Sequence, residues 1–246
     1  MSAGVDARSS RAYRFRGGEI HMDPQHPARP TAMDGTDGLL PELLARHTET
    51  YNAAAPEYER RVSQNYEHAD RRVRRIAQSL VPGGKVLEVG CGVGLNLLWL
   101  ARRGFICTGI DSSEEMVRLA RRRNPGAGVI IGDFLSHDLS SSYDAIVADA
   151  VVHLFPEPGV RAFMAKCREL LRPSGVLCLG TTVSASSSEG WKVKSDFSGN
   201  LMRYRREWTR QEFEALLADD GWKVLDYWEL PDPRGKNWMC IVGTLA

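Results

Sequence analysis

The sequence has almost no excess of charge of either sign. Its 246 residues carry 32 Lys and Arg against 31 Asp and Glu, which gives a formal net charge of +1. Proteins that bind nucleic acid by broad electrostatic attraction usually show a strongly basic domain or a basic stripe. The near balance of charge therefore predicts no nucleic-acid partner and disfavours a polyanionic substrate.

Long apolar runs and paired cysteines are also lacking. The chain has no run of about 18 apolar residues, which is the length needed to span a membrane. Charges and prolines stand near the beginning, where a secretory signal would need an apolar core. The cysteines are odd in number and show no C-x-x-C spacing, which is typical of reduced core thiols: Cys91, Cys107, Cys167, Cys178 and Cys240. These absences predict a cytoplasmic protein without membrane contact.

Residues 1–40 mix Arg, Gly, Pro, Asp and Ser with little periodicity, so burial there could not offset the entropy cost of ordering. We expect a disordered leader. Because Met22 and Met33 are alternative starts, residues 1–32 need not belong to the natural protein. Residues 41–246 are expected to form one domain, which is long enough for a buried core.

The most informative stretch is VLEVGCGVGLN, from Val86 to Asn96. An apolar run leads into glycines at every second position, which predicts a strand, a tight turn and a helix start against which a ligand can lie. The dinucleotide pattern G-x-G-x-x-G is not matched, because Leu95 takes the place of its third glycine. This mismatch weakens the prediction of a nicotinamide-cofactor site without excluding such a site.

Two further strands are expected to end in acidic residues. Asp111 follows GFICTGI at close to the spacing of a ribose-binding carboxylate, and Asp133 follows GVIIG. An ordinary helix-start carboxylate is the alternative for Asp111, since the helix dipole favours acids there.

Together these motifs resemble those of the class I S-adenosylmethionine-dependent methyltransferases. The resemblance implies that Glu88 holds the ammonium of the cofactor, that Asp111 binds the ribose hydroxyls, and that Asp133 accepts from the adenine amino group beside Phe134. It implies S-adenosylmethionine as cofactor, S-adenosylhomocysteine as product and no metal. The predicted cofactor-binding residues are Glu88, Gly90, Cys91, Gly92, Asn96, Asp111, Ser112, Met116, Gly132, Asp133, Phe134 and Asp149.

The resemblance also implies the fold. We expect an α/β, Rossmann-like class I methyltransferase sandwich, in which a seven-stranded, mostly parallel sheet ends with an antiparallel last strand. A helical lid over about 41–80 and a substrate cover over about 184–208, after the fifth strand, complete it. The apolar spacing over residues 160–171 predicts a helix packed on the sheet. A last helix near 210–219 and strands near 222–229 and 238–244 follow.

The fourth strand, residues 143–149, ends where this family places groups that face the transferred methyl. Asp149 and His153 are the candidate catalytic residues there. A neutral imidazole can act as a general base, but a lone histidine among apolar residues is more often a packed or hydrogen-bonded residue. The Asn/Asp-Pro-Pro-Tyr motif is absent from this strand end, which disfavours methylation of nucleic acid.

Tyr51 and Tyr58 in the lid are candidate substrate contacts, and packing of both rings on the sheet is an equal alternative. Their spacing of seven residues would place them on one helix face, but we expect Pro56 to start a new helix between them.

The predicted cover is locally basic: Lys192, Lys194, Arg203, Arg205 and Arg206. Arginine binds phosphate, phosphonate or carboxylate oxygens through two parallel hydrogen bonds, and alternation places Arg203 and Arg205 on one face of an extended strand. This pattern predicts an anionic substrate. The alternative is a basic loop whose charges are only solvated. Residues 236–238 are expected near the same rim, without an assigned role.

We therefore predict methyl transfer to a small, anionic acceptor in specialised metabolism, at a phosphonate or carboxylate oxygen; phosphonate O-methyltransferases are one candidate subgroup by analogy. Three alternatives stay open: a methyltransferase of a neutral amine or phenol, in which His153 or Asp149 gains importance as a base, a methyltransferase of a protein, and a non-catalytic cofactor-binding regulatory protein. The partner is expected to be the small-molecule substrate, and the protein a monomer or a homodimer.

Overall fold

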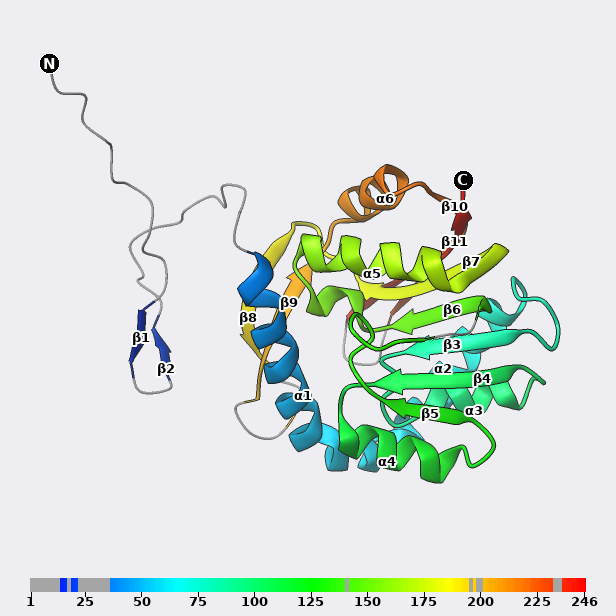
Figure 1. Cartoon of the computed structure of the whole chain (residues 1–246), viewed down its shortest axis with the longest axis horizontal. Coiled ribbons are helices and arrows are strands. Elements are labelled where there is room, and N and C mark those ends of the chain that lie inside the picture. The colour runs from blue at the N-terminus through cyan, green and yellow to red at the C-terminus, as the bar shows by residue number, and fades with distance from the viewer. Residues whose placement is uncertain are drawn as a thin grey trace, which may run out of the picture. The chain divides into compact units, whose positions relative to one another are not determined.

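The computed structural model describes residues 14–16, 19–21, 36–139, 142–194, 197, 201–231 and 236–246 (Figure 1). Of the predicted leader it describes an antiparallel pair, β1 (Arg14–Arg16) and β2 (Glu19–His21), and the start of the first helix. The rest of that prediction lies outside the described residues. Residues 37–246 form a separate compact unit, which contains every element discussed below.

The centre of this unit is a seven-stranded sheet in the order β10-β11-β7-β6-β3-β4-β5. Strands β7, β6, β3, β4 and β5 are parallel, and β11 runs antiparallel to both of its neighbours. This arrangement confirms the predicted sheet. The strands are β3 (Lys85–Val89), β4 (Ile106–Asp111), β5 (Gly128–Ile131), β6 (Tyr143–Asp149), β7 (Leu171–Thr182), β10 (Trp222–Pro231) and β11 (Asn237–Leu245).

Apolar side chains on both faces of the sheet hold it between two helical layers. Along β6, Ile146 belongs to the core beneath α5 (Glu157–Leu170) and α6 (Arg210–Asp219), whereas Val147 belongs to the opposite core. That second core contains side chains of α3 (Leu95–Ala101) and α4 (Glu114–Arg123). Burial on both faces explains why the parallel strands are nearly continuous apolar runs. Because these five strands run parallel, their carboxyl ends all lie at one edge of the sheet.

The predicted lid consists of α1 (Thr36–Arg60) and α2 (Val62–Ala77). The prediction that Pro56 starts a new helix is wrong, because α1 continues through this proline and ends at Arg60. Pro56 cannot donate to the carbonyl four residues earlier. Ala54 and Ala55, just before it, are buried. Packing of α1 against the rest of the domain therefore keeps it helical although this one hydrogen bond is missing.

The predicted cover is a separate two-stranded antiparallel sheet, formed by β8 (Ser188–Val193) and β9 (Met202–Glu207). It lies beside α1 (Figure 1), and the Thr50 hydroxyl donates to the carbonyl of Met202 at 2.6 Å. Lid and cover therefore contact each other directly. In the described part of the chain, the helices are all too short or too polar to cross a membrane.

Candidate functional site

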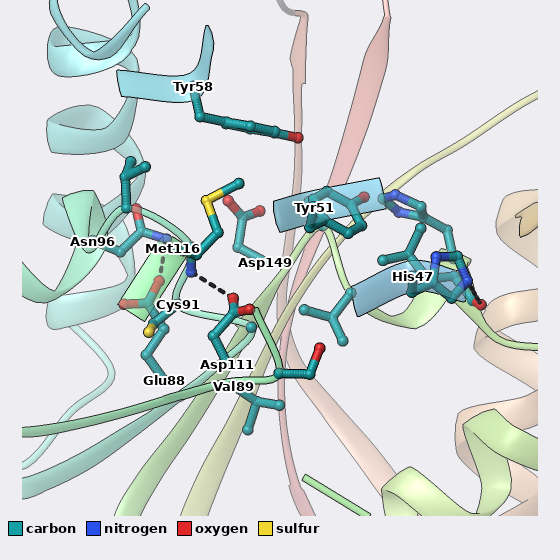
Figure 2. A pocket seen from close by; sticks show the side chains of 18 of the residues that line it. His47, Tyr51, Tyr58, Glu88, Val89, Cys91, Asn96, Asp111, Met116 and Asp149 are labelled. Atoms are coloured by element: carbon teal, nitrogen blue, oxygen red, sulfur yellow. Dashed lines mark hydrogen bonds between the residues drawn. The ribbon is translucent and has the colours of Figure 1, made fainter. Parts of the chain in front are cut away.

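A cavity of about 310 Å³ lies at the carboxyl ends of β3, β4, β5 and β6. Figure 2 shows Tyr51 and Tyr58 of α1 on one side of this space and Glu88, Asn96 and Asp111 on the other. Residues from the lid, from the turns after the parallel strands and from the β8–β9 hairpin line it. We call it the main cavity. It joins the predicted cofactor residues to most of the predicted substrate residues.

The glycine turn after β3 forms one wall of the main cavity. Gly92 has φ +51°, and a Cβ atom on it would meet nothing within 4 Å, which leaves open space against the backbone. Gly90 has φ +65°, and a Cβ atom there would collide with Val151. Both positions therefore need glycine, one to leave room for a ligand and the other for close packing.

A Gly90→Ala substitution is expected to destabilise the protein by about 2–4 kcal/mol, because left-handed backbone strain adds to the overpacking against Val151. The free energy of unfolding, measured in urea, checks this. Gly126→Ala is the matched control, since its added methyl would meet nothing within 4 Å; it should change stability by less than about 0.5 kcal/mol. Equal stability of the two variants would contradict the close approach described for Gly90.

Asp111, at the end of β4, is held by two backbone amides. Its carboxylate accepts from Gly92 N at 2.8 Å and from Ser113 N at 2.9 Å. Burial raises its pKa, and these two hydrogen bonds oppose the rise. Ser113 in turn caps α4, where its hydroxyl accepts from Met116 N at 3.2 Å. The carboxylate is thus fixed between the glycine turn and the start of α4, at the cavity wall.

Glu88 lies at the bottom of the cavity and is 3% exposed. Its Oε1 accepts from Asn96 Nδ2 at 3.0 Å, while its buried Oε2 has no hydrogen-bond partner among the described residues. Burial raises the pKa of Glu88 to about 8, so at neutral pH the carboxyl group is mainly protonated. A cation placed against it would restore the carboxylate.

Arg72 reaches from the lid into the same end of the cavity. It forms a buried ion pair with Asp149, at the end of β6, and lies 5.9 Å from the ring centroid of Trp238. Asp149 Oδ1 and Arg72 Nε are buried and have no hydrogen-bond partner within the described part of the chain. Asp149 is therefore engaged by an arginine, which makes it a poor candidate for a general base.

The carboxylate of Asp133, after β5, is hydrogen-bonded within its own turn. Its carboxylate accepts from the Ser136 amide at 3.0 Å and from the Ser136 hydroxyl at 2.7 Å. Phe134 is buried and contacts Phe163, with ring centroids 5.0 Å apart. Asp133 and Phe134 both line the main cavity, as does Met116. This end of the cavity therefore combines an apolar wall with a fixed carboxylate.

His153 is 1% exposed and lines the cavity near the lid. Burial, together with nearby Arg205 and Arg203, holds its pKa well below the ordinary value, so the imidazole is neutral. His47 of α1 is also neutral, because burial lowers its pKa to about 4; its Nε2 lies 3.1 Å from the carbonyl oxygen of Leu154. Two neutral histidines therefore face the space between lid and sheet.

The β8–β9 hairpin supplies cations to the same space. Lys194, Arg203 and Arg205 are 2%, 7% and 8% exposed, and all three line the main cavity. Arg203 Nη1 donates to the Tyr51 hydroxyl at 3.2 Å, and Lys194 Nζ lies 3.5 Å from the ring centroid of Phe197. Aromatic neighbours thus hold Arg203 and Lys194 at the cavity wall, whereas Arg205 donates to the Thr182 hydroxyl and pairs with Glu207.

Most predicted site residues line the main cavity; two do not. Arg206 pairs with Glu157 and Glu189 and lies over the Trp208 ring, because it points to the face of β9 opposite Arg205. Lys192 lines a second cavity instead. The predicted residues that line the main cavity are Tyr51, Tyr58, Glu88, Gly90, Cys91, Gly92, Asn96, Asp111, Ser112, Met116, Gly132, Asp133, Phe134, Asp149, His153, Lys194, Arg203 and Arg205.

Two further residues line the cavity that were not predicted from the sequence, Arg72 and His47. A usable signal existed for Arg72, which stands in an apolar stripe of α2 at helical spacing with Ala69, Val73 and Ile76. A charged residue within such a stripe is buried and needs a partner. His47 offered no comparable signal.

Residues 86–175 match the methyltransferase domain family. The ubiquinone biosynthesis O-methyltransferase of Xanthomonas campestris pv. campestris (strain B100) is 33% identical over 111 residues, which make up 43% of this chain and 46% of that protein. The chain spans about half the length of the curated relatives it matches.

Two solved structures resemble the whole domain. One is the Burkholderia thailandensis 1,6-didemethyltoxoflavin-N1-methyltransferase with 1,6-didemethyltoxoflavin and S-adenosylhomocysteine: TM-score 0.68, 18% identity, 92% of this chain and 98% of that chain covered. The other is the DhpI–SAH complex: TM-score 0.68, 19% identity, 83% of this chain and 97% of that chain covered. At such identities the likeness establishes the fold.

Proposed function

We propose that this protein, which has the class I methyltransferase fold and carries a methyltransferase domain over residues 86–175, transfers the methyl group of S-adenosylmethionine to an anionic oxygen of a small molecule. The observation that carries the anionic acceptor is the group of three buried cations, Lys194, Arg203 and Arg205, in the cavity that also contains the glycine turn. Guanidinium and ammonium groups that line a cavity bind phosphonate, phosphate or carboxylate oxygens through charge-assisted hydrogen bonds, so an anionic acceptor complements this lining.

The cofactor is supported by the buried polar atoms at the other end of the main cavity. Glu88 Oε2 and Asp149 Oδ1 are acceptors, Arg72 Nε is a donor, and within the described residues none of these atoms has a hydrogen-bond partner. Two acceptors beside one donor suit the ammonium and carboxylate of an amino-acid group. Asp111 and Phe134 line the same cavity, where Asp111 would accept from the ribose hydroxyls and Phe134 would give the base an apolar surface.

The residues of this chain have a simple task in such a reaction. The cofactor supplies a methyl group on a sulfonium sulfur, and as the S–CH3 bond breaks and the O–CH3 bond forms, the sulfur loses its positive charge and the acceptor one negative charge. No proton moves, so no base is needed. The arginines bind the other oxygens of the acceptor and hold it in line, which is the main source of rate enhancement for such a transfer. The low basicity of His153 agrees with this assignment.

The test is S-adenosylhomocysteine release from purified protein and S-adenosylmethionine, across a matched panel of small phosphonates, carboxylates, amines and phenols. We expect turnover with phosphonates or carboxylates and none with the neutral acceptors. Turnover confined to amines or phenols would overturn the anionic acceptor and return His153 to consideration as a base. Calorimetric binding of S-adenosylhomocysteine without any turnover would instead favour the regulatory alternative.

A further inference from the structure

One face of α1 packs against α4, the helix that follows β4. Asn52, Ala55 and Glu59 stand on this face at positions i, i+3 and i+7, which is the spacing of one side of a helix. Ala55 is fully buried and shares a small core with Leu119 of α4. Glu59 pairs with Arg123 at the end of α4, with an N–O distance of 2.5 Å. The lid and α4 are therefore held together by an apolar contact and an ion pair.

At the start of α4, Asn52 completes the helix cap from a different helix. The first amides of a helix have no partner within it, and side-chain oxygens can accept from them. Ser113 Oγ accepts from Met116 N at 3.2 Å, and Asn52 Oδ1 accepts from Glu115 N at 3.2 Å. Asn52 Oδ1 also accepts from the Ser113 hydroxyl at 2.7 Å. Because Ser113 is 0% exposed, Asn52 provides the acceptor that its buried hydroxyl needs.

Ser113 joins this cap to the carboxylate of Asp111. The Ser113 amide donates to Asp111 Oδ1 at 2.9 Å, while the Gly92 amide donates to Oδ2 at 2.8 Å. The orientation of the carboxylate therefore depends on the position of Ser113, which in turn depends on Asn52. Asp111 lines the main cavity and Asn52 does not. A residue of the lid thus acts on the wall of the cavity through one intermediate residue.

Asn52 is itself held in place, as a positioning residue must be. The two residues before it contact β9: Thr50 Oγ1 donates to the carbonyl of Met202 at 2.6 Å, and the Tyr51 hydroxyl accepts from Arg203 Nη1 at 3.2 Å. Supporting residues orient a site only when their own conformations are fixed by packing and hydrogen bonds. One turn of α1 is therefore fixed between the hairpin and the start of α4.

We propose that Asn52 is a positioning residue of the cofactor site, which holds the Asp111 carboxylate in place through Ser113. This inference rests on the proposed function for the role of Asp111 as the acceptor for the ribose hydroxyls. Asn52 then contributes to cofactor affinity without contacting the cofactor. The same turn of α1 that contacts the acceptor-side hairpin thereby also supports the binding of the ribose.

The test is a double-mutant cycle on S-adenosylhomocysteine affinity, measured by calorimetry for Asn52→Ala, Asp111→Asn and the double variant. Alanine is favourable within a helix, so Asn52→Ala removes the contact without weakening α1 itself. We expect each single variant to bind at least about tenfold more weakly than the natural protein. In the Asp111→Asn background, Asn52→Ala should cost less than about threefold, because the two residues act as one unit. An equal loss in both backgrounds would overturn the proposal.

Two further variants separate positioning from a general loss of stability. Asn52→Asp keeps an acceptor oxygen for Ser113 and Glu115, so it should bind S-adenosylhomocysteine within about threefold of the natural protein. Glu49→Ala, at an exposed position of α1, is the matched control and should stay within about twofold. An Asn52→Asp protein as weak as Asn52→Ala would overturn the role of the acceptor oxygen.

Amide hydrogen exchange, followed by NMR without any ligand, tests the inference apart from the proposed function. The Ser113 amide should exchange at least about tenfold faster in Asn52→Ala, while the amide of buried Val242 in β11 should keep its rate. An unchanged rate at Ser113 would overturn the positioning role. Failure of the proposed function gives a different result, in which the natural protein does not bind S-adenosylhomocysteine or Asp111→Asn binds it equally well; the cofactor role of Asn52 then falls with it.

Discussion

Replacing Arg203 by methionine is expected to lower kcat/KM for an anionic acceptor by about a hundredfold to a thousandfold. Arg203 is 7% exposed and lines both cavities, so methionine fills much of its volume but leaves a bound anion without its guanidinium. Losing one partner of a buried charge pair costs about 2–5 kcal/mol, and each 1.4 kcal/mol is a factor of about ten. Initial rates over a range of acceptor concentrations measure the change.

Two further variants make the Arg203 result specific. Tyr51→Phe removes only the hydrogen bond from Arg203 Nη1, so its effect on kcat/KM should be at least about tenfold smaller. Arg210→Met changes an exposed arginine of α6 that pairs with Glu214, and it should leave the kinetics unaltered. S-adenosylhomocysteine affinity should stay within about threefold in all three variants. An Arg203→Met protein that keeps full turnover with the anionic acceptor would contradict the acceptor-binding role.

Replacing Glu88 by glutamine is expected to make the protein more resistant to alkaline pH. The pKa of Glu88 is about 8 in the folded protein, above the ordinary 4.5, so unfolding releases a proton between these values and stability falls as pH rises. Glutamine does not titrate. The variant should therefore match the natural protein near pH 4.5 and exceed it by a few kcal/mol near pH 8. Urea unfolding at the two pH values measures the difference.

The same substitution is expected to weaken cofactor binding by about tenfold to a hundredfold, because a carboxylate beside an ammonium is replaced by a neutral amide. Binding of S-adenosylhomocysteine to the natural protein near pH 7 should also release a proton, since the ammonium favours the ionised form of Glu88. Calorimetry in two buffers of different ionisation enthalpy detects that proton. Glu115→Gln, on the exposed start of α4, is the control. Proton release that persists in Glu88→Gln would show that another group is responsible.

The strand ends were the most predictable part of this protein. Glu88, Asp111 and Asp133 follow apolar runs, and parallel strands bring such ends to one edge whatever the details of packing. The seven-stranded, mostly parallel sheet followed from the family resemblance, as did its antiparallel last strand, β11. At these strand ends the local sequence pattern and the overall fold favour the same structure, which is why their positions could be predicted from the sequence.

The lid was harder to predict, because tertiary packing decides its conformation. Pro56 has a strong local tendency to begin a helix, but α1 passes through it. The buried pair of Arg72 and Asp149 joins residues far apart in the chain, and no local rule identifies such a partner. For Arg206 the local rule existed: side chains alternate along a strand, so Arg205 and Arg206 cannot share a face.

The hairpin that carries the cations forms its own small sheet, apart from the seven strands that hold the glycine turn. Under the proposed function, acceptor choice and cofactor binding are encoded in different segments, so a chimera that exchanges residues 184–208 should change acceptor choice and keep cofactor binding. Contacts with three elements limit that freedom: Thr50 and Tyr51 of α1 hydrogen-bond to β9, and β9 also contacts Thr182 of β7 and Glu157 of α5. The unit to exchange is consequently the hairpin together with these contact residues, and they should evolve together.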